Sequence, residues 1–463
     1  MSGNLLALVL AAGEGTRFKS EKAKVLHPIL GKSMVQLVLE AVRKLRPEKI
    51  YVVVGYQKEE VEKVLAPYKV NFIPQQTQLG TAHAAMQAEK ELKKDCDKDV
   101  LILYGDMPLL TPASLRPLLD CHHRQGNAMT LMSAELENPK GFGRLIWSDD
   151  RLEAIVEERE ATPIQRRLKE INAGIYLFRV KELLQALPQI SNHNRKGEYY
   201  LTDIVEIFSR QKKKVGVYRT PASEEVVGVN SRFELARAAE VLRMRKIRKL
   251  TERGVTVLDP GTTWIDLDVR IGTETVIHSS VIIEGKSRVG SGCLLSPFVH
   301  LINTKVGNGV RILSSSVIEE SVVEDGAKVG PFTHLRPGTV IRQGAKVGNF
   351  VELKNTDFGK HSKAGHLTYL GDSIVEEDAN IGAGTITCNY DGFKKHKTHI
   401  EREAFIGSGV ELVAPVKIGK GAYVGAGSTI TKDVSPGALA VERSEQREKP
   451  GWVEKKRKKR KNR

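Results

Sequence analysis

Residues 405–425 read FIGSGVELVAPVKIGKGAYVG, and this stretch indicates how the second half of the chain folds. An Ile-Gly or Val-Gly pair ends at Gly407, Gly419 and Gly425, so the separations are multiples of six residues. A six-residue repeat built around one apolar residue is the signature of a parallel β-helix, in which each unit forms one short flat strand and a turn.

The repeat extends well beyond this stretch. Of the 41 glycines in the chain, 26 follow residue 254. We expect a β-helix over residues 255–445, with the apolar residue pointing inward and glycine supplying the turn conformation. One coil cannot bury its own core, so the stability must come from stacking. The same apolar-glycine pairs occur at Ile271-Gly272, Val289-Gly290, Val306-Gly307, Val329-Gly330, Val347-Gly348 and Ile381-Gly382.

The first 229 residues follow a different pattern. Buried-strand runs such as LLALVLAAG, KIYVVVG, DVLILYGD and AGIYLFRV are separated by stretches that include the helical pattern MVQLVLEAVRKL. Strands that alternate with helices predict a mainly parallel, Rossmann-like α/β sheet. Residues 230–254 repeat apolar side chains at helical intervals and end at a glycine, which predicts a connecting helix.

The formal charge of +16 is concentrated at the C-terminus. Residues 455–463, KKRKKRKNR, supply eight positive charges and contain no apolar residue, so we expect residues 446–463 to form a basic, disordered tail. No aromatic side chain is interleaved with these charges, which argues against a nucleic-acid partner. The rival prediction, nucleic-acid binding through the tail, requires that affinity collapse when 455–463 is removed.

Two features favour a cytoplasmic protein without a membrane partner. The early apolar run Leu5–Ala12 is too short to span a bilayer and has no basic leader or cleavage site, so it is interpreted as a strand. The four cysteines lie far apart and form no C-x-x-C pair, which disfavours a disulfide framework.

The stretch LVLAAGEGTRFKSEKAKVL, residues 8–26, carries the first candidate chemistry. Glycines just after a strand let backbone N–H groups approach phosphate oxygens, and Arg17 and Lys24 can balance a nucleotide's charge. The whole string resembles sugar-phosphate nucleotidyltransferases. It departs from that family at Ala23, where proline is usual.

This resemblance implies a metal-assisted attack of a sugar 1-phosphate on a nucleoside triphosphate. Arg17 and Lys24 would be catalytic, and Mg²⁺ would be held by Asp106, which ends LYGD, and by Asn230. Read alone, Asp106 could instead be a turn residue that caps the following helix. The resemblance assigns UTP binding to Leu10, Ala11, Ala12, Gly13, Lys24, Gln75, Gly80 and Thr81, and N-acetylglucosamine-1-phosphate binding to Gly141, Glu157, Asn172 and Asn230.

A second set of polar residues lies within the repeats. Arg336 and Lys354 are separated by eighteen residues, or three hexapeptides, so they can stack on one face and hold a phosphate; solvated surface is the alternative. At KAGHLTYLGD, residues 363–372, the six-residue repeat is interrupted, and His366 and Tyr369 occur in this stretch. Imidazole ordinarily titrates near physiological pH, which suits a general base.

KAGHLTYLGD and the later ANIGAGTITCNYDG together resemble the acetyltransferase half of the bifunctional GlmU family, and the resemblance runs from about Leu5 to Arg443. It implies a left-handed β-helix, acetyl transfer to glucosamine 1-phosphate, then uridylyl transfer that yields UDP-N-acetylglucosamine for bacterial peptidoglycan and lipopolysaccharide precursors. It also implies a homotrimer. By this resemblance His366 is the base, glucosamine 1-phosphate is bound by Arg336, Lys354, Tyr369 and Asn380, and acetyl-CoA by Ala383, Asn389, Tyr390, Ser408, Ala426 and Arg443.

Two other functions compete with this reading. A nucleotide-sugar pyrophosphorylase with a purely structural or regulatory β-helix has no need of His366 or Asn380. A non-catalytic binding protein resembling translation-factor exchange subunits could lose Arg17, Lys24 or Asp106 freely, yet all three are present.

Overall fold

The computed structural model describes residues 4–461; Met1–Gly3, and Asn462 and Arg463 at the end of the predicted tail, lie outside the described part. The chain divides into two compact units, 1–242 and 243–463. The division falls within α8 (Arg232–Thr251), which forms where the connecting helix was predicted.

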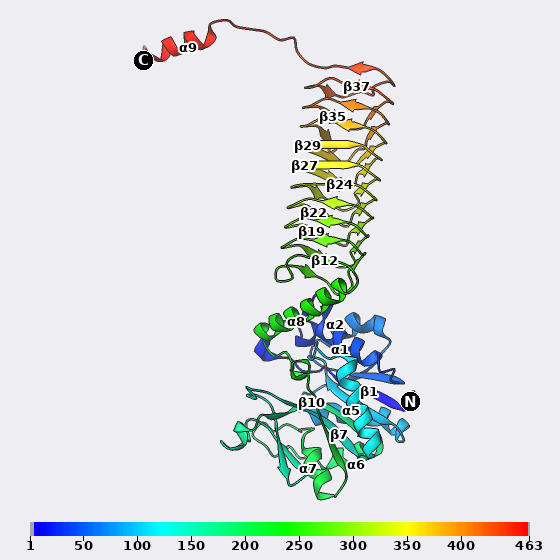
Figure 1. Ribbon diagram of the computed structural model, residues 1–463, viewed down its shortest axis with the longest axis vertical. Coiled ribbons are helices and arrows are strands. Elements are labelled where there is room, and N and C mark those ends of the chain that lie inside the picture. The colour runs from blue at the N-terminus through cyan, green and yellow to red at the C-terminus, as the bar shows by residue number, and fades with distance from the viewer. Residues whose placement is uncertain (1–3, 462–463) are drawn as a thin grey trace. The chain divides into compact units, whose positions relative to one another are not determined.

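The N-terminal unit is built on a mixed sheet with the strand order β11-β7-β10-β6-β1-β4-β5 (Figure 1). Strands β1 (Leu5–Leu10), β4 (Lys49–Val54), β5 (Asn71–Pro74) and β6 (Asp99–Tyr104) are parallel. Strand β10 (Glu170–Arg179) runs antiparallel to β6 and to β7 (Met129–Glu135), and β11 (Val215–Arg219) runs parallel to β7. The hairpin of β8 (Arg144–Ser148) and β9 (Arg151–Val156) joins through β10.

Both faces of this sheet are buried. In β1, Leu6 and Leu8 belong to one apolar cluster whereas Ala7 and Val9 belong to another, as the alternation of side chains in a strand requires. A strand buried on both faces reads as an unbroken apolar run, which is what LLALVL shows. The helices of this unit are α1 (Met34–Arg43), α2 (Lys58–Leu65), α3 (Thr81–Met86), α4 (Glu89–Leu92), α5 (Pro112–Gln125), α6 (Val180–Ala186) and α7 (Asp203–Arg210).

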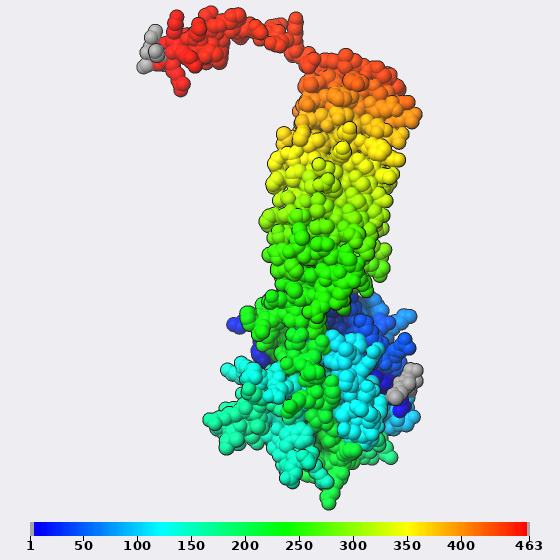
Figure 2. Space-filling view, in the orientation of Figure 1, coloured from blue at the N-terminus to red at the C-terminus, as the bar shows by residue number. Residues whose placement is uncertain are grey.

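The C-terminal unit contains a parallel β-helix from β12 (Thr256–Val257) to β39 (Leu439–Ala440), whose coils follow one another in sequence order along the stack (Figures 1 and 2). Its strands are mostly two or three residues long and pair in parallel from coil to coil. Ile277, Leu295, Ile312, Val329 and Val347 occupy equivalent positions on successive coils and form one column of the core. Two strands are much longer, β27 (Lys346–Lys354) and β29 (Lys363–Gly371).

The glycine of the apolar-glycine pair has a different role from the one predicted. At most of these positions the glycine does not have a positive φ; instead the neighbouring coil approaches too closely for a side chain. A Cβ on Gly290 would lie 2.4 Å from the carbonyl oxygen of Gly307, and one on Gly407 would lie 2.6 Å from the backbone nitrogen of Ala426. The repeat therefore selects glycine chiefly for the close stacking of coils, and Gly330, with φ 95°, is an exception.

The C-terminal segment differs from the predicted disordered tail. Residues Trp452–Lys461 form helix α9, directly after Gly451, and its side chains are exposed from Trp452 to Arg460. Lysine, arginine and glutamate have high intrinsic helix propensity, which accounts for a helix without a packed face. All four cysteines are free, and no helix within residues 4–461 is long and apolar enough to cross a membrane.

Candidate active sites

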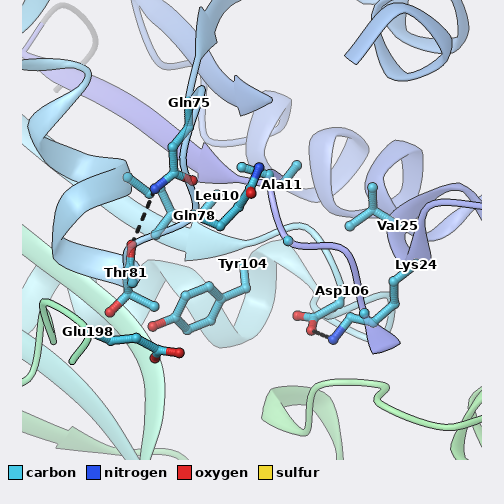
Figure 3. A pocket seen from close by; sticks show the side chains of 15 residues that line it. Leu10, Ala11, Lys24, Val25, Gln75, Gln78, Thr81, Tyr104, Asp106 and Glu198 are labelled. Atoms are coloured by element: carbon cyan, nitrogen blue, oxygen red, sulfur yellow. Dashed lines mark hydrogen bonds and ion pairs between the residues drawn. The ribbon is translucent and has the colours of Figure 1, made fainter. Parts of the chain in front are cut away.

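A pocket of about 260 Å³ lies at the carboxyl edge of the parallel strands of the N-terminal unit (Figure 3). The loop after β1, the segment after β5, the start of α3 and the end of β6 all contribute to it, which is the usual place for a ligand in an open α/β sheet. It gathers nine of the residues assigned from the resemblance: Leu10, Ala11, Ala12, Gly13, Lys24, Gln75, Gly80, Thr81 and Asp106.

The conformation of the loop depends on specific contacts. Gly15 has φ 75°, and a Cβ there would lie 2.5 Å from the Cβ of Lys24, so no side chain fits. Ala23, which replaces the usual proline, has φ −51° and donates its backbone N–H to Oε1 of Gln57 at 2.7 Å. That hydrogen bond supplies local order that a proline ring would otherwise supply.

Lys24 joins the two residues assigned to the metal. Its ammonium forms an ion pair with Oδ2 of Asp106 and donates to Oδ1 of Asn230 at 2.9 Å. Arg17 also donates to Oδ1 of Asn230, at 2.8 Å, so both proposed catalytic cations converge on the same amide oxygen. Asp106 and Asn230 are separated by more than a hundred residues in sequence, and Val229 is tied to the backbone of Asp106 by a 2.9 Å hydrogen bond.

These residues fit a magnesium ion. The carboxylate of Asp106 and the amide oxygen of Asn230 converge on one point, where the Lys24 ammonium acts as the cation. Within residues 4–461, no group of three or more histidine, cysteine or acidic side chains is arranged to hold a metal. Two protein oxygens completed by substrate phosphates and water are the ligand set that Mg²⁺ prefers.

The residues assigned to the sugar lie next to this pocket. Glu157 is largely buried, so burial raises the pKa of its carboxyl, and it accepts a hydrogen bond from Thr202 at 3.3 Å. Tyr104 lines the pocket beside Thr81 (Figure 3). Its hydroxyl forms hydrogen bonds with the side chains of Thr81 and Tyr176. Tyr176 in turn accepts a 2.6 Å hydrogen bond from the amide of Asn172. A continuous chain of polar contacts therefore links Thr81 to Asn172.

Two of the residues assigned to the sugar, Asn172 and Gly141, are less well placed to contact a ligand through a side chain. The amide of Asn172 is already engaged, because its oxygen accepts from the N–H of Gly174 while its nitrogen donates to Tyr176. Gly141 is exposed in a turn with φ 90° and has open space around it. Its backbone conformation, not a side chain, is what this position contributes.

His366 lies on β29 beside β27, with Asn349 as its direct partner in the parallel register. Its Nδ1 is 2.5 Å from Oδ1 of Asn349. A carboxamide oxygen only accepts hydrogen bonds, so the ring donates from Nδ1 and its Nε2 is the basic nitrogen. The imidazole itself is exposed.

The two basic residues separated by three hexapeptides lie on adjacent coils. Leu335 pairs with Leu353, which places Arg336 next to Lys354, and Arg336 donates to Oε1 of Glu352 at 2.9 Å. The ammonium of Lys395 lies close enough to lower the pKa of Lys354, and Arg336 adds to this effect. Three cations therefore lie close together, and such a cluster can attract an anion.

Tyr369 and Asn389 surround the end of β29. A Cβ built on Gly371 would lie 2.5 Å from the hydroxyl oxygen of Tyr369 and 2.6 Å from Nδ2 of Asn389, so both side chains pass over this glycine. Asn389 is buried and donates to Asp372 at 2.6 Å. Tyr390 is exposed and donates to the carbonyl of Gly392, and Asn380 pairs with Lys363 in the β-helix register.

Four of the six residues assigned to acetyl-CoA form a column that begins at His366, whereas Asn389 and Tyr390 lie outside it. Ala364 pairs with Ile381, Ile381 with Ile406 and Ile406 with Val424. The residues two positions further on are therefore equivalent on successive coils, and they are His366, Ala383, Ser408 and Ala426. Arg443 closes the column by donating to the carbonyl of Ala426 at 3.0 Å.

Three residues of these sites were missed by the sequence analysis: Tyr104, Asn349 and Lys395. Tyr104 stands two residues before Asp106, so its place at the strand end was a usable signal. Asn349 lies seventeen residues before His366, about one coil, and the repeat period could have paired them. Lys395 lies in an irregular loop and had no such signal.

Comparison with known proteins identifies two families along the chain. The MobA-like NTP transferase domain family matches residues 7–198, and the bacterial transferase hexapeptide family, in six repeats, matches residues 397–432. The predicted fold class, an α/β nucleotidyltransferase domain followed by a left-handed parallel β-helix, is confirmed.

Similarity to curated relatives covers nearly the whole chain. The bifunctional protein GlmU of Thermotoga sp. (strain RQ2) is 49% identical over 452 residues, which is 98% of this chain and 99% of that protein. The GlmU proteins of Alkaliphilus metalliredigens and Streptococcus agalactiae are each 45% identical, over 98% and 97% of this chain and 98% of each relative. Because both halves are covered together and in the same order, this chain belongs to the GlmU family of bifunctional proteins.

Proposed function

We propose that this protein is a bifunctional enzyme that transfers an acetyl group from acetyl-CoA to glucosamine 1-phosphate and then a uridylyl group from UTP to the product. The products of the second step are UDP-N-acetylglucosamine and pyrophosphate. The observation that carries the proposal is the presence of two separate polar sites, one within each unit, in a chain of the GlmU family.

Acetyl transfer follows from the arrangement around His366. The Nε2 atom takes a proton from the sugar ammonium, and the free amine attacks the thioester carbonyl. The C–N bond forms, the C–S bond breaks, and the coenzyme A thiolate takes up a proton. Asn349 holds the ring in the tautomer that leaves Nε2 basic. Arg336, Lys354 and Lys395 would bind the substrate phosphate, and the column from Ala383 to Arg443 would bind acetyl-CoA.

Uridylyl transfer requires that two anions approach each other. Arg17 and Lys24 lower this repulsion and align the phosphates, with the loop backbone close to them. When bound at Asp106 and Asn230, Mg²⁺ would neutralise charge that develops on the phosphates. Lys24 must then move its contacts from these two oxygens to the substrate phosphates.

We also propose a homotrimer, on the basis of an apolar stripe along one corner of the β-helix. Phe298, Phe332, Phe350 and Leu367 are at least half exposed, and each has a positive φ at a coil corner. The rings of Phe332 and Phe350 stack with centroids 5.3 Å apart. Because Leu367 follows His366 directly, contact along this stripe would bring a second subunit to the acetyl-transfer site. Such exposed patches mark protein interfaces.

A cytoplasmic location is the remaining part of the proposal. It is supported by four free cysteines and by substrates that belong to the cytoplasm.

The test uses purified protein, Mg²⁺ and glucosamine 1-phosphate, with acetyl-CoA alone, UTP alone, and both together. Free thiol and pyrophosphate are followed separately. Thiol release with acetyl-CoA alone, and pyrophosphate only with both donors, is the expected result. Pyrophosphate without thiol release would show a pyrophosphorylase with a structural β-helix. If neither product formed, a non-catalytic binding protein would be favoured.

A further inference from the structure

A basic groove lies at the amino end of β1, the opposite end from the nucleotide loop. Asn4 and Leu5 at the start of β1, the end of α1 and one side of α5 form its walls, and these elements lie together in Figure 1. Its volume is about 1210 Å³, compared with about 260 Å³ for the nucleotide pocket. The six residues of β1 separate the two by roughly 20 Å.

The groove is lined by four cationic side chains: Arg43, Lys44, Arg46 and Arg116. Among the described residues none of the four forms an ion pair, and all four are exposed. The only carboxylate among the groove's described lining residues is Asp120. The groove therefore carries a net positive charge, which Asp120 offsets only in part.

Acidic residues near the groove are already engaged elsewhere. Asp95 forms ion pairs with Lys49 and Lys98 at 2.8 and 2.7 Å, and Glu48 pairs with Lys98 at 2.6 Å. Asp99 accepts from His123, which also lines the groove, at 2.8 Å. Burial opposes the ionisation of Asp99, but its hydrogen bonds with His122 and His123 hold its pKa below the ordinary value.

The helix dipole explains only part of this arrangement. Cations at the C-terminal end of a helix are favourable, which accounts for Arg43 and Lys44 at the end of α1. It does not account for Arg116, which lies in the N-terminal half of α5. Nor does it account for Arg46, which lies beyond α1 in a left-handed backbone conformation with φ 57°.

Arg43 is held in an orientation that suits ligand recognition. Its guanidinium lies 5.8 Å from the centroid of the Tyr68 ring, so the aromatic face orients it without using its N–H donors. A planar guanidinium binds phosphate and carboxylate groups in a bidentate manner. Leu5, Leu45 and Leu119 also line the groove and can contact an apolar body.

From this arrangement we propose that the groove is a second anion-binding site that takes a small organic molecule with at least two phosphate or carboxylate groups. Bidentate contacts from Arg43 and Arg116 on opposite walls bind separate anionic groups, and Lys44 and Arg46 add electrostatic attraction. The site shares no residue with either transfer reaction.

The test measures binding of two probes, fructose 1,6-bisphosphate and citrate, to the full-length protein by calorimetry. Hydrogen exchange locates the bound probe. We expect at least one probe to bind with Kd below about 1 mM at about 0.1 M salt, and more weakly at about 0.5 M. Amides of residues 39–46 and 116–124 become protected. If fructose 1,6-bisphosphate binds and citrate does not, the groove is a phosphate site. If both probes bind, it is a general site for polyanions.

The variant Arg43→Gln with Arg116→Gln should weaken binding at least about tenfold while both transfer activities stay unchanged. A matched control, Arg151→Gln with Lys181→Gln, removes two exposed cations outside the groove and should bind as the unaltered protein does. The proposal is overturned if neither probe binds at about 10 mM, if both double variants lose affinity equally, or if protection falls on the nucleotide loop.

Discussion

Asn349 and His366 lie side by side on adjacent strands of the β-helix, with Oδ1 of the amide 2.5 Å from Nδ1 of the imidazole. The amide fixes the tautomer of the ring, and the parallel register of β27 and β29 fixes the amide. A strand pairing that looks purely structural therefore sets which ring nitrogen is free to accept a proton.

Asn349→Ala should lower kcat for acetyl transfer about tenfold and leave KM for both substrates nearly unchanged, because orientation and not binding is lost. Asn349→Asp keeps an accepting oxygen and should retain most of the activity. Steady-state thiol release checks this. An aspartate variant as slow as the alanine variant would show that Asn349 does not act through Nδ1.

Asp106→Ala should lower uridylyl transfer at least about a hundredfold, because it removes one of the two oxygens that converge on the cation position. Acetyl transfer should remain intact, since His366 lies in the other unit. Parallel assays of released pyrophosphate and released thiol measure the two transfer activities. His366→Ala is the reciprocal control, and a loss of both activities in either folded variant would contradict two independent sites.

Lys395→Gln should raise KM for glucosamine 1-phosphate about tenfold with little change in kcat, because it removes one of three cations at the phosphate. The neighbouring Lys394→Gln serves as the matched control. Initial rates of acetyl transfer over a range of sugar-phosphate concentrations give both constants. If both substitutions raised KM equally, the overall positive charge of this surface would matter and the position of Lys395 would not.

Asp203 should make the stability of the N-terminal unit depend on pH. Burial, together with the charges of Glu206 and Glu157, raises the pKa of its carboxyl to about 6. Because the folded state binds this proton more tightly, the stabilisation is complete below pH about 4 and is lost as pH rises through about 6. Above pH about 6, the variant Asp203→Asn should therefore be more stable than the unaltered protein by about 1–2 kcal/mol, after a discount for solvent screening.

Urea unfolding of the N-terminal unit at several pH values measures this difference. The exposed Asp150→Asn is the control, and its difference from the unaltered protein should not vary with pH. If Asp203→Asn likewise gave a constant difference from pH about 4 to about 8, the carboxyl would not titrate as described.

Phe332→Ser combined with Phe350→Ser should reduce association of the β-helix units, because it removes the stacked pair from the apolar stripe. Sedimentation velocity should show smaller particles. Acetyl transfer should fall while uridylyl transfer persists. Phe233→Ser, at another exposed aromatic position, is the control. Unchanged sedimentation of the double variant would place any interface elsewhere.

Local patterns along the chain predict the fold class and the segments that carry both candidate sites. A six-residue period and unbroken strand runs are local properties, because each coil or strand repeats the same burial requirement. The motifs around Lys24 and His366 are short and continuous, so the chain alone places one in the loop after β1 and the other within the repeats.

Only the tertiary structure decided which distant residues meet. The convergence of Asp106 and Asn230 on Lys24, and the position of Lys395 beside Lys354, join segments that no local pattern relates. The same holds for the antiparallel placement of β10 and for the glycines of the apolar-glycine pairs, which the close stacking of neighbouring coils selects more often than a positive φ does. Such contacts depend on the packing of whole elements against one another, and that information is spread over the entire chain.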